Sequence, residues 1–313
     1  MRRLIFVPAL PITNRYPEFW LTEFTKKFKD NFDEVIVLGE NYISSLLINN
    51  DRKQEMFSGI NSAIDFELIQ ISEFMKLKLS NQDSIFLSDL SFPGLFSNIL
   101  YHKKPNNCFV YLHATSKNNY DYFSKIKYSK YPCEVAHSKL FKKVFVGSEY
   151  HKRKLGWNNI KVLGVPVPPF KVFKKDKKYD IISVSRPSIQ KVNKKLEKQV
   201  ERDFGKITRK NTNSWEEYYK FLSEAKVVLL SGKEETFGYQ VLEAITNNST
   251  PLAPNKFSYP ELLPKEYLYD DYDDLCMKIW AVLHDDLEPP EKLLCNDLCE
   301  NFYENIINEM RGE

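Results

Sequence analysis

The sequence predicts an α/β protein of two domains, each built on a parallel β-sheet. The chain has 313 residues, which is room for two domains of about 150 residues each. Short β-branched and aromatic runs alternate with stretches long enough for helices, the pattern of βα repeats. The run VPVPPF at 165–170 contains three prolines, which neither a helix nor a central strand accommodates. It therefore marks a linker between the domains.

The first half of the chain predicts a Rossmann-like domain. Strands are expected at 3–7, 34–38, 66–71, 84–87, 108–112 and 143–146, with a helix at 17–28. Their alternation with helix-length gaps predicts right-handed crossovers. Arg2 and Arg3 before an apolar stretch imitate a signal peptide, but Pro8 and Pro11 interrupt that stretch and no small-residue cleavage site follows. We expect a first buried strand there.

The second half repeats the alternation. Strands are expected at 180–184, 227–230 and 251–253. Three helices are expected, one that ends near 204, one at 215–225 and one that begins at 240, and the segment 206–209 is ambiguous. The acidic, amphipathic stretch 291–310 predicts a last helix that covers one domain or crosses back to the first. The expected domains are 1–166, with 296–313 returning to it, and 167–295.

Composition narrows the class of protein. Hydrophobic residues make up 42% and charged residues 28%, which excludes a disordered or fibrous chain. No window reaches about 18 consecutive apolar residues, so no transmembrane segment is expected. The five cysteines show neither a CxxC pair nor zinc-ligand spacing, which predicts reduced thiols and a cytoplasmic protein.

Charge is strongly segregated along the chain. Residues 101–210 carry a net charge of +19, whereas 211–313 carry −13. The basic span predicts a polyanionic partner, and the alternative is that its Lys-rich helices are simply solvated. Aromatic residues are interleaved with the lysines, as in proteins that stack on unpaired bases: Tyr120, Tyr122, Phe123, Tyr128 and Tyr131.

The segment ETFGYQVLE at 235–243 is the strongest candidate site. It follows the expected strand 227–230 and opens a helix, so free backbone N–H groups and the positive helix end favour an anionic ligand. Gly238 allows close approach of the backbone. Glu235 lies in the loop at the carboxyl end of the sheet, where its carboxylate can accept bonds from sugar hydroxyls, and Glu243, two helical turns on, can accept from a ribose diol. The alternative is an ordinary acidic helix start.

Residues 180–270 resemble the donor-binding region of retaining GT-B glycosyltransferases of family 4. The likeness lies in SWEEYYKFLSEAKVVLLSGKEETFG, the Glu-x7-Glu motif and the following Thr-Pro strand and PEL tripeptide. It implies a GT-B fold, two Rossmann-like domains facing across a cleft. It also implies a sugar transferred from a nucleotide diphosphate sugar, such as a UDP-sugar, without a metal or other cofactor.

The resemblance implies roles for the donor-side residues. Glu235 would contact the transferred sugar where the glycosidic bond breaks, and Glu243 would hold the ribose. The backbone N–H groups of Phe237, Gly238 and Tyr239 would meet the sugar and diphosphate. Two cations, Arg186 and Lys191, would neutralise the leaving diphosphate.

On the first domain, the resemblance assigns the sugar and acceptor contact to His113, at the end of strand 108–112; the alternative is a structural histidine. Asp89, after strand 84–87, is a weaker acceptor-side candidate. The first loop lacks the Gly-Gly pair of many relatives, and Asn14 or Arg15 would substitute for it. Asp271-Tyr-Asp273 matches the DxD metal motif of the other glycosyltransferase fold, but we interpret it as a solvated turn and helix cap.

The +19 span, the cysteine usage, the compact length and the composition rich in Lys, Asn and Tyr resemble those of a bacteriophage enzyme that glycosylates modified bases in DNA. The resemblance implies a hydroxymethyl- or hydroxy-pyrimidine base as the acceptor, which would need a positive groove and an extruded base. The alternatives are a bacterial polysaccharide or lipid-linked glycan transferase docked on an anionic membrane, a tRNA-modifying enzyme, and a non-enzymatic nucleic-acid-binding protein on a degenerate transferase fold.

Overall fold

The computed structural model describes residues 2–11, 16–42, 56–90, 93–103, 105–167, 173, 175–184, 192–212 and 214–312. The chain forms two compact units. Unit 1 comprises Met1–Gly147, Lys154–Leu163 and Asn301–Glu313, and unit 2 comprises Ser148–Arg153 and Gly164–Glu300. Both are α/β units with parallel sheets, so the predicted fold class is confirmed.

Unit 1 is built on six parallel strands in the order β2-β1-β3-β4-β5-β6. The strands are β1 (Arg3–Val7), β2 (Glu34–Val37), β3 (Ser84–Leu87), β4 (Asn107–Tyr111), β5 (Lys143–Val146) and β6 (Ile160–Val162). The helices are α1 (Tyr16–Lys29), α3 (Met56–Met75), α4 (Phe96–Lys103), η1 (Tyr122–Ile126), α5 (Lys127–Ser138), α6 (Glu149–Leu155), which begins in unit 2, and α12 (Phe302–Arg311).

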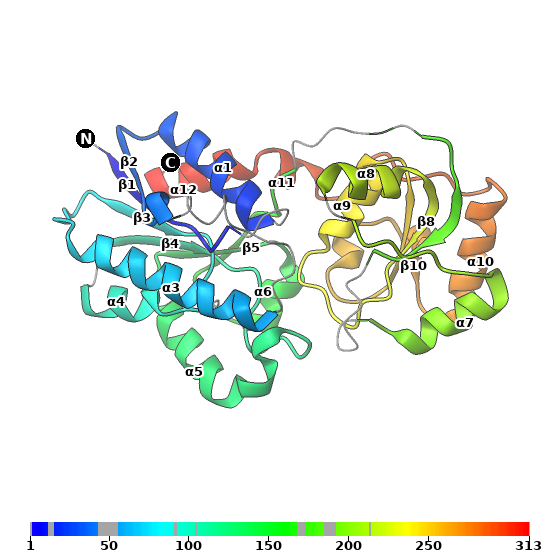
Figure 1. Ribbon diagram of the computed structural model, residues 1–313, viewed down its shortest axis with the longest axis horizontal. Helices are drawn as coiled ribbons and strands as arrows, with labels where there is room; N and C mark the ends of the chain where they lie inside the picture. Colours follow the sequence, from blue (N-terminus) through cyan, green and yellow to red (C-terminus); the bar gives the residue numbers. More distant parts are fainter. Residues whose placement is uncertain are drawn as a thin grey trace. The chain divides into compact units, whose positions relative to one another are not determined.

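Helices cover the unit 1 sheet on two sides, with α1 and α12 on one side and α3, α4 and α5 on the other (Figure 1). Phe6 of β1 packs against Phe24 and Phe28 of α1, with ring centres 5.8 and 5.3 Å apart. Its neighbour Ile5 faces the opposite layer, in a cluster that includes Phe74 of α3. The sheet is therefore covered on both faces, as the near-continuous apolar strands require.

The predicted strand at 66–71 is wrong, because these residues lie inside helix α3. Phe66, Gln70 and Phe74 are each 1% exposed and recur every four residues, which places them on one buried face of the helix. A six-residue apolar run does not distinguish a buried strand from one stretch of a longer buried helix. The sixth strand of the sheet is the unpredicted β6.

Unit 2 has four parallel strands in the order β10-β9-β8-β7. They are β7 (Tyr179–Ile182), β8 (Ala225–Leu229), β9 (Thr250–Pro254) and β10 (Leu268–Tyr269). The helices are α7 (Lys194–Phe204), α8 (Trp215–Ser223), α9 (Tyr239–Thr246), η2 (Tyr259–Glu261), η3 (Lys265–Tyr267), α10 (Tyr272–Leu283) and α11 (Asn296–Glu300). The ambiguous piece at 206–209 touches the sheet through one parallel bridge, Ile182 with Thr208.

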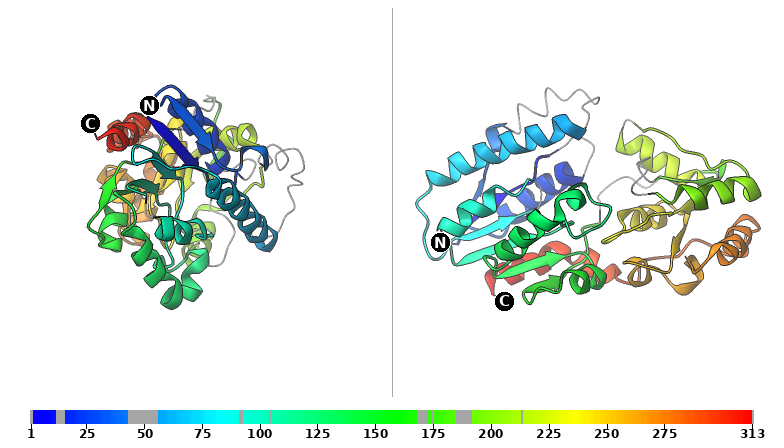
Figure 2. Two further views of the ribbon diagram at one scale, coloured as in Figure 1. Left: turned by 90° about the vertical axis from the view of Figure 1, so that its left-hand side faces the viewer. Right: turned by 90° about the horizontal axis from the view of Figure 1, so that it is seen from below.

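The end of the chain is two helices rather than the single expected one. Asn301 separates α11, in unit 2, from α12, which packs in unit 1 near the N-terminal strand (Figure 2). Phe302 of α12 is fully buried, with its ring centre 5.5 Å from both Trp20 and Tyr111. The break lets one acidic segment supply apolar faces to two separate cores.

Asp271 is a helix cap, as predicted: its carboxylate accepts a hydrogen bond of 2.9 Å from the N–H of Asp274 at the start of α10. Across the described residues, no group of three or more His, Cys, Asp or Glu side chains is arranged to hold a metal ion. No helix in the same part of the chain combines the length and apolar character that a membrane span requires.

Candidate active site

The loop between β8 and α9 forms the centre of the candidate site in unit 2. It leaves the carboxyl end of β8, in the middle of the sheet, and enters the first turn of α9 at Tyr239. Ligands of open α/β sheets bind at this edge, where loops and helix N-termini converge. The structure thus places Glu235, Phe237, Gly238 and Tyr239 on one short loop and helix start.

Gly238 caps the N-terminus of α9 in a left-handed conformation, with φ of +104°. A Cβ atom there would lie 3.2 Å from Cδ1 of Leu262 and 3.3 Å from Cε1 of Tyr259. Both the backbone angle and the lack of space require glycine. The tight turn leaves the first N–H groups of α9 directed at the loop, as an anion-binding helix start needs.

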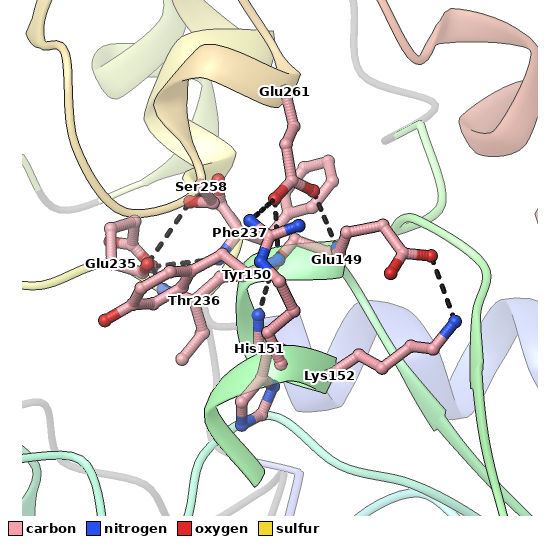
Figure 3. A network of polar contacts seen from close by, with 11 residues as sticks. Glu149, Tyr150, His151, Lys152, Glu235, Thr236, Phe237, Ser258 and Glu261 are labelled. Atoms are coloured by element: carbon pink, nitrogen blue, oxygen red, sulfur yellow. Dashed lines mark hydrogen bonds and ion pairs between the residues drawn. The ribbon is translucent and has the colours of Figure 1, made fainter. Parts of the chain in front are cut away.

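Glu235 is half-buried and is held close to its own loop (Figure 3). Its Oε1 accepts a hydrogen bond of 3.0 Å from the N–H of Thr236. The hydroxyl of Ser258 donates to the carbonyls of Glu235 and Phe237, at 3.2 and 2.7 Å. Burial, together with the negative charge of Glu235, raises the pKa of Tyr259 well above its ordinary value. The loop therefore holds a carboxylate beside a buried, uncharged phenol.

Glu243 is buried, with 2% of its surface exposed, and lies on α9 facing α8. The hydroxyls of Tyr218 and Tyr219 donate to its two carboxylate oxygens, at 2.8 and 3.2 Å. Burial and then the nearby Glu243 charge raise the pKa of both phenols. The Glu243 carboxylate is therefore held inside unit 2 by phenol donors on both of its oxygens. Sequence analysis did not identify Tyr218 and Tyr219 as site residues. The only signal for them was two adjacent tyrosines in the helix expected before strand 227–230.

A second anchor of the loop between β8 and α9 comes from the segment around the start of α6. Ser148 donates its hydroxyl to the carbonyl of Thr236 at 2.5 Å, and the hydroxyl of Tyr150 donates to Glu234 at 3.3 Å. Burial and the Glu234 charge raise the pKa of Tyr150 to about 12, so the phenol stays a donor at neutral pH. Sequence reasoning missed this anchor, because its partners are 88 and 84 residues apart in the chain.

Glu261, of the PEL tripeptide, caps helix α6 (Figure 3). Its two carboxylate oxygens accept from the backbone N–H groups of Glu149 and Tyr150, both at 2.6 Å. Arg153 adds an ion pair of 3.2 Å on the exposed side. The carboxylate thus satisfies N–H groups that the helix start leaves without intrahelical partners.

A buried carboxylate, Glu197 of α7, joins the ends of β7 and β8. It accepts from the hydroxyls of Ser183 and Ser231 at 3.0 and 2.8 Å, and pairs with Arg209 at 2.8 Å. Arg209 also pairs with Glu201 at 2.9 Å. The ion pair fixes the segment at 206–209, for which the sequence predicted neither a strand nor a helix, against the carboxyl edge of the sheet.

In unit 1, His113 lies two residues beyond β4, at the carboxyl edge of the sheet. Its ring packs against Trp20 and Tyr111, with centres 4.5 and 5.1 Å apart. Burial lowers the pKa of His113 to about 4, and a hydrogen bond with the backbone of Ser88 acts in the opposite direction. The imidazole is therefore neutral at physiological pH, suited to hydrogen bonding rather than to charge neutralisation.

Asp89 follows β3, which pairs with β4, so Asp89 and His113 lie at the same edge of the unit 1 sheet. Its Oδ1 accepts from the N–H of Leu90 at 2.8 Å. The remaining predicted site residues, Asn14, Arg15, Arg186 and Lys191, lie outside the described residues.

No family profile matches the chain. A stretch of 99 residues is 32% identical to tRNA-queuosine alpha-mannosyltransferase of Drosophila melanogaster, covering 32% of this chain and 26% of that protein. The match therefore spans about a quarter of the relative.

Solved structures share the fold at low identity. Sucrose-phosphate synthase from Thermosynechococcus elongatus has a TM-score of 0.60 at 10% identity, over 100% of this chain and 94% of that one. HepE of Anabaena, in complex with UDP and glucose, has a TM-score of 0.58 at 11% identity, over 99% and 95%. TarM of S. aureus, in complex with UDP, has a TM-score of 0.51 at 16% identity, over 78% of this chain and 56% of that one. The fold is that of the GT-B glycosyltransferases.

Proposed function

We propose that this protein is a retaining glycosyltransferase that uses a nucleotide diphosphate sugar, such as a UDP-sugar, and needs no metal ion. The observation that carries the proposal is the loop at 235–238, where Glu235 and the start of α9 share the carboxyl edge of the unit 2 sheet. The UDP complexes of HepE and TarM, which share the fold, support this class of donor.

In this mechanism the donor diphosphate meets the N–H groups at the start of α9, and the predicted cations Arg186 and Lys191 stabilise the charge that develops on it as the glycosidic bond breaks. Glu235 accepts bonds from hydroxyls of the transferred sugar, and Glu243 holds the ribose in place. The acceptor hydroxyl attacks the anomeric carbon on the face that the diphosphate leaves. The departing diphosphate takes the acceptor proton, while neutral His113 orients sugar and acceptor through hydrogen bonds.

The proposed acceptor is a hydroxyl on a modified nucleoside within a nucleic acid. The net charge of +19 over 101–210 supports a polyanionic acceptor. The expected form is a hydroxymethyl- or hydroxy-pyrimidine in bacteriophage DNA. The local similarity to a tRNA-queuosine mannosyltransferase favours a hydroxylated tRNA base as the second form.

The first test is a donor screen. Purified protein is incubated with UDP-, GDP- and other nucleotide sugars, with hydroxymethylated DNA, with tRNA and without acceptor, and both sugar transfer and nucleotide release are measured. Transfer to one nucleic acid with retained anomeric configuration, unchanged by EDTA, is the expected result. Inverted configuration contradicts the retaining mechanism, and transfer only to a lipid-linked glycan contradicts the nucleic-acid acceptor. Nucleic-acid binding without any donor turnover supports the non-enzymatic alternative.

The second test separates chemistry from folding. Loss of one preorganised hydrogen-bonding group that stabilises the transition state typically lowers turnover by about 100- to 1000-fold, and a loss of this order is expected for Glu235→Gln. The matched control is Glu266→Gln, an exposed carboxylate of η3 in the same unit with the same change in charge. Equal turnover of both variants and the wild type would remove Glu235 from the mechanism.

A further inference from the structure

The outer side of η1 and the first turn of α5 carries an unusual combination of exposed side chains. Four consecutive residues, Lys125, Ile126, Lys127 and Tyr128, form what we term the η1–α5 surface; Lys127 is half-buried and the other three are exposed. Tyr128 is 87% exposed and Ile126 is 50% exposed. The ammonium group of Lys127 lies 5.2 Å from the centre of the Tyr128 ring. The surface therefore offers an open aromatic face with a cation beside it.

Two other aromatic residues of this basic segment, Phe123 and Tyr131, pack inside unit 1. Phe123 is 8% exposed and lies under the ammonium of Lys130, 4.2 Å from the ring centre. Tyr131 packs against the core and stacks on Trp157, with ring centres 6.4 Å apart. Tyr128 is thus the aromatic ring that α5 presents to solvent.

The segment at 117–143 is positive without internal compensation. It holds seven lysines and two acidic residues, Asp121 and Glu134. Asp121 accepts from the N–H of Phe123 as the cap of η1, and Glu134 is 3% exposed. Among the described residues, none of the seven lysines forms an ion pair with a carboxylate. Their charge is therefore available to an external polyanion.

The inner side of α5 holds the loop that carries His113. The carboxylate of Glu134 accepts three hydrogen bonds from Ser116, two from its N–H at 3.2 and 3.1 Å and one from its hydroxyl at 2.8 Å. Ser116 lies three residues after His113, at the carboxyl edge of the unit 1 sheet. In unit 1, α5 lies on the opposite side of the sheet from α1 and α12 (Figure 1). One short helix therefore joins a basic, aromatic surface to the candidate acceptor loop.

We propose that the η1–α5 surface docks an unpaired stretch of the nucleic-acid acceptor, with a base stacked on Tyr128 and phosphates paired with Lys125 and Lys127. This proposal rests on the proposed function and adds the place where the acceptor binds. A base of any sequence stacks on an aromatic face, and a positively charged surface beside that face binds the backbone phosphates.

An anionic membrane is the competing partner for a basic amphipathic surface. The other exposed positions of α5 are Ser129, Pro132, Cys133 and Ala136, which are small or weakly apolar. One isoleucine and one tyrosine form no continuous apolar face of the kind that an interfacial helix buries. The η1–α5 surface thus combines positive charge with little exposed apolar area. This combination favours a nucleic acid over an anionic membrane as its partner.

The test measures binding of a fluorescent oligouridylate, and of the matching oligothymidylate, of about 15 nucleotides by anisotropy. Tyr128→Ala is expected to weaken binding by about 5- to 150-fold, the usual loss of one stacked base, while Tyr128→Phe keeps the affinity. The double variant Lys125→Ser, Lys127→Ser lowers the slope of log affinity against log salt by about 1.4, because two phosphate contacts are lost. The matched control is Lys26→Ser, Lys27→Ser, two exposed lysines of α1 in the same unit.

The outcomes separate the docking surface from the proposed function. If the Lys125→Ser, Lys127→Ser variant and the Lys26→Ser, Lys27→Ser control lose the same affinity, the oligonucleotide binds diffusely and the proposed surface is wrong. If Tyr128→Ala binds as the wild type does, no base stacks there and the proposal fails. In both of these outcomes, hydrolysis of the nucleotide sugar by every variant would still support the proposed glycosyltransferase function. Binding to vesicles containing phosphatidylglycerol, lost in Tyr128→Ala without any effect on the oligonucleotides, would assign the surface to a membrane instead.

Discussion

The phenol of Tyr218 donates a hydrogen bond of 2.8 Å to the buried carboxylate of Glu243. The second residue of the Glu-x7-Glu motif is therefore fixed by a helix that precedes it in the sequence, α8, as well as by its own helix. A carboxylate held in this way needs no reordering when it binds a ligand, which reduces the entropy cost of binding.

Glu243→Ala is expected to destabilise unit 2 by about 1–3 kcal/mol, because two buried tyrosine hydroxyls lose their acceptor. Glu243→Gln keeps one acceptor oxygen and is expected to lose less. Urea unfolding of both variants, followed by tyrosine and tryptophan fluorescence, measures the difference. A Glu243→Ala protein as stable as the wild type would show that the tyrosine bonds contribute no net stability.

Gly238→Ala is expected to lower the free energy of unfolding by more than the strain of a left-handed alanine alone. The new Cβ meets Leu262 and Tyr259 at 3.2 and 3.3 Å, in addition to the φ of +104°. Gly156 is the control, because it has φ of +69° and open space around it. Gly156→Ala should lose about 1–2 kcal/mol and Gly238→Ala measurably more, with donor binding lost as well. Equal urea midpoints for the two variants would contradict the packing argument.

His113 is expected to make stability depend on pH between its unfolded and folded pKa values. The folded pKa is about 4 and the ordinary value is 6.5, so the unfolded state binds more protons in this window and stability falls as the pH decreases. The loss between about pH 7 and pH 5 is about 2 kcal/mol. His113→Phe, which keeps a ring against Trp20, should abolish this share of the pH dependence. Urea unfolding of the wild type and of His113→Phe at several pH values between about 5 and 7 measures this difference. Identical dependence of stability on pH in the two proteins would contradict the prediction.

Glu261→Ala removes the acceptor of two N–H groups at the start of α6, at a cost of about 0.5–2 kcal/mol. The exposed ion pair with Arg153 adds little, so Arg153→Ala should be nearly neutral. Because Ser148 and Tyr150 hold the donor loop through Thr236 and Glu234, the KM for the donor should rise in Glu261→Ala and not in Arg153→Ala. Thermal shifts with and without UDP separate the two effects.

Local sequence patterns were sufficient for most of the fold and for the loop that carries the candidate site. The βα alternation predicted the parallel sheets, and the strand, glycine and helix start around Gly238 predicted the loop at 235–238. The prediction for 66–71 failed because Phe66 and its neighbours satisfy a strand pattern and a helix pattern equally well over six residues.

By itself the sequence determined the two parallel α/β units and the loop that bears Glu235, because strand periodicity, helix starts and the need for glycine at a left-handed turn are properties of short segments. Only the tertiary structure decided that tyrosines of α8 hold Glu243, that Glu261 caps α6, and that Tyr128 is exposed while Tyr131 is packed inside. These outcomes depend on contacts between side chains that are tens of residues apart in the chain. Which groups are buried, with shifted pKa values, and which rings stay exposed is decided only when the core forms.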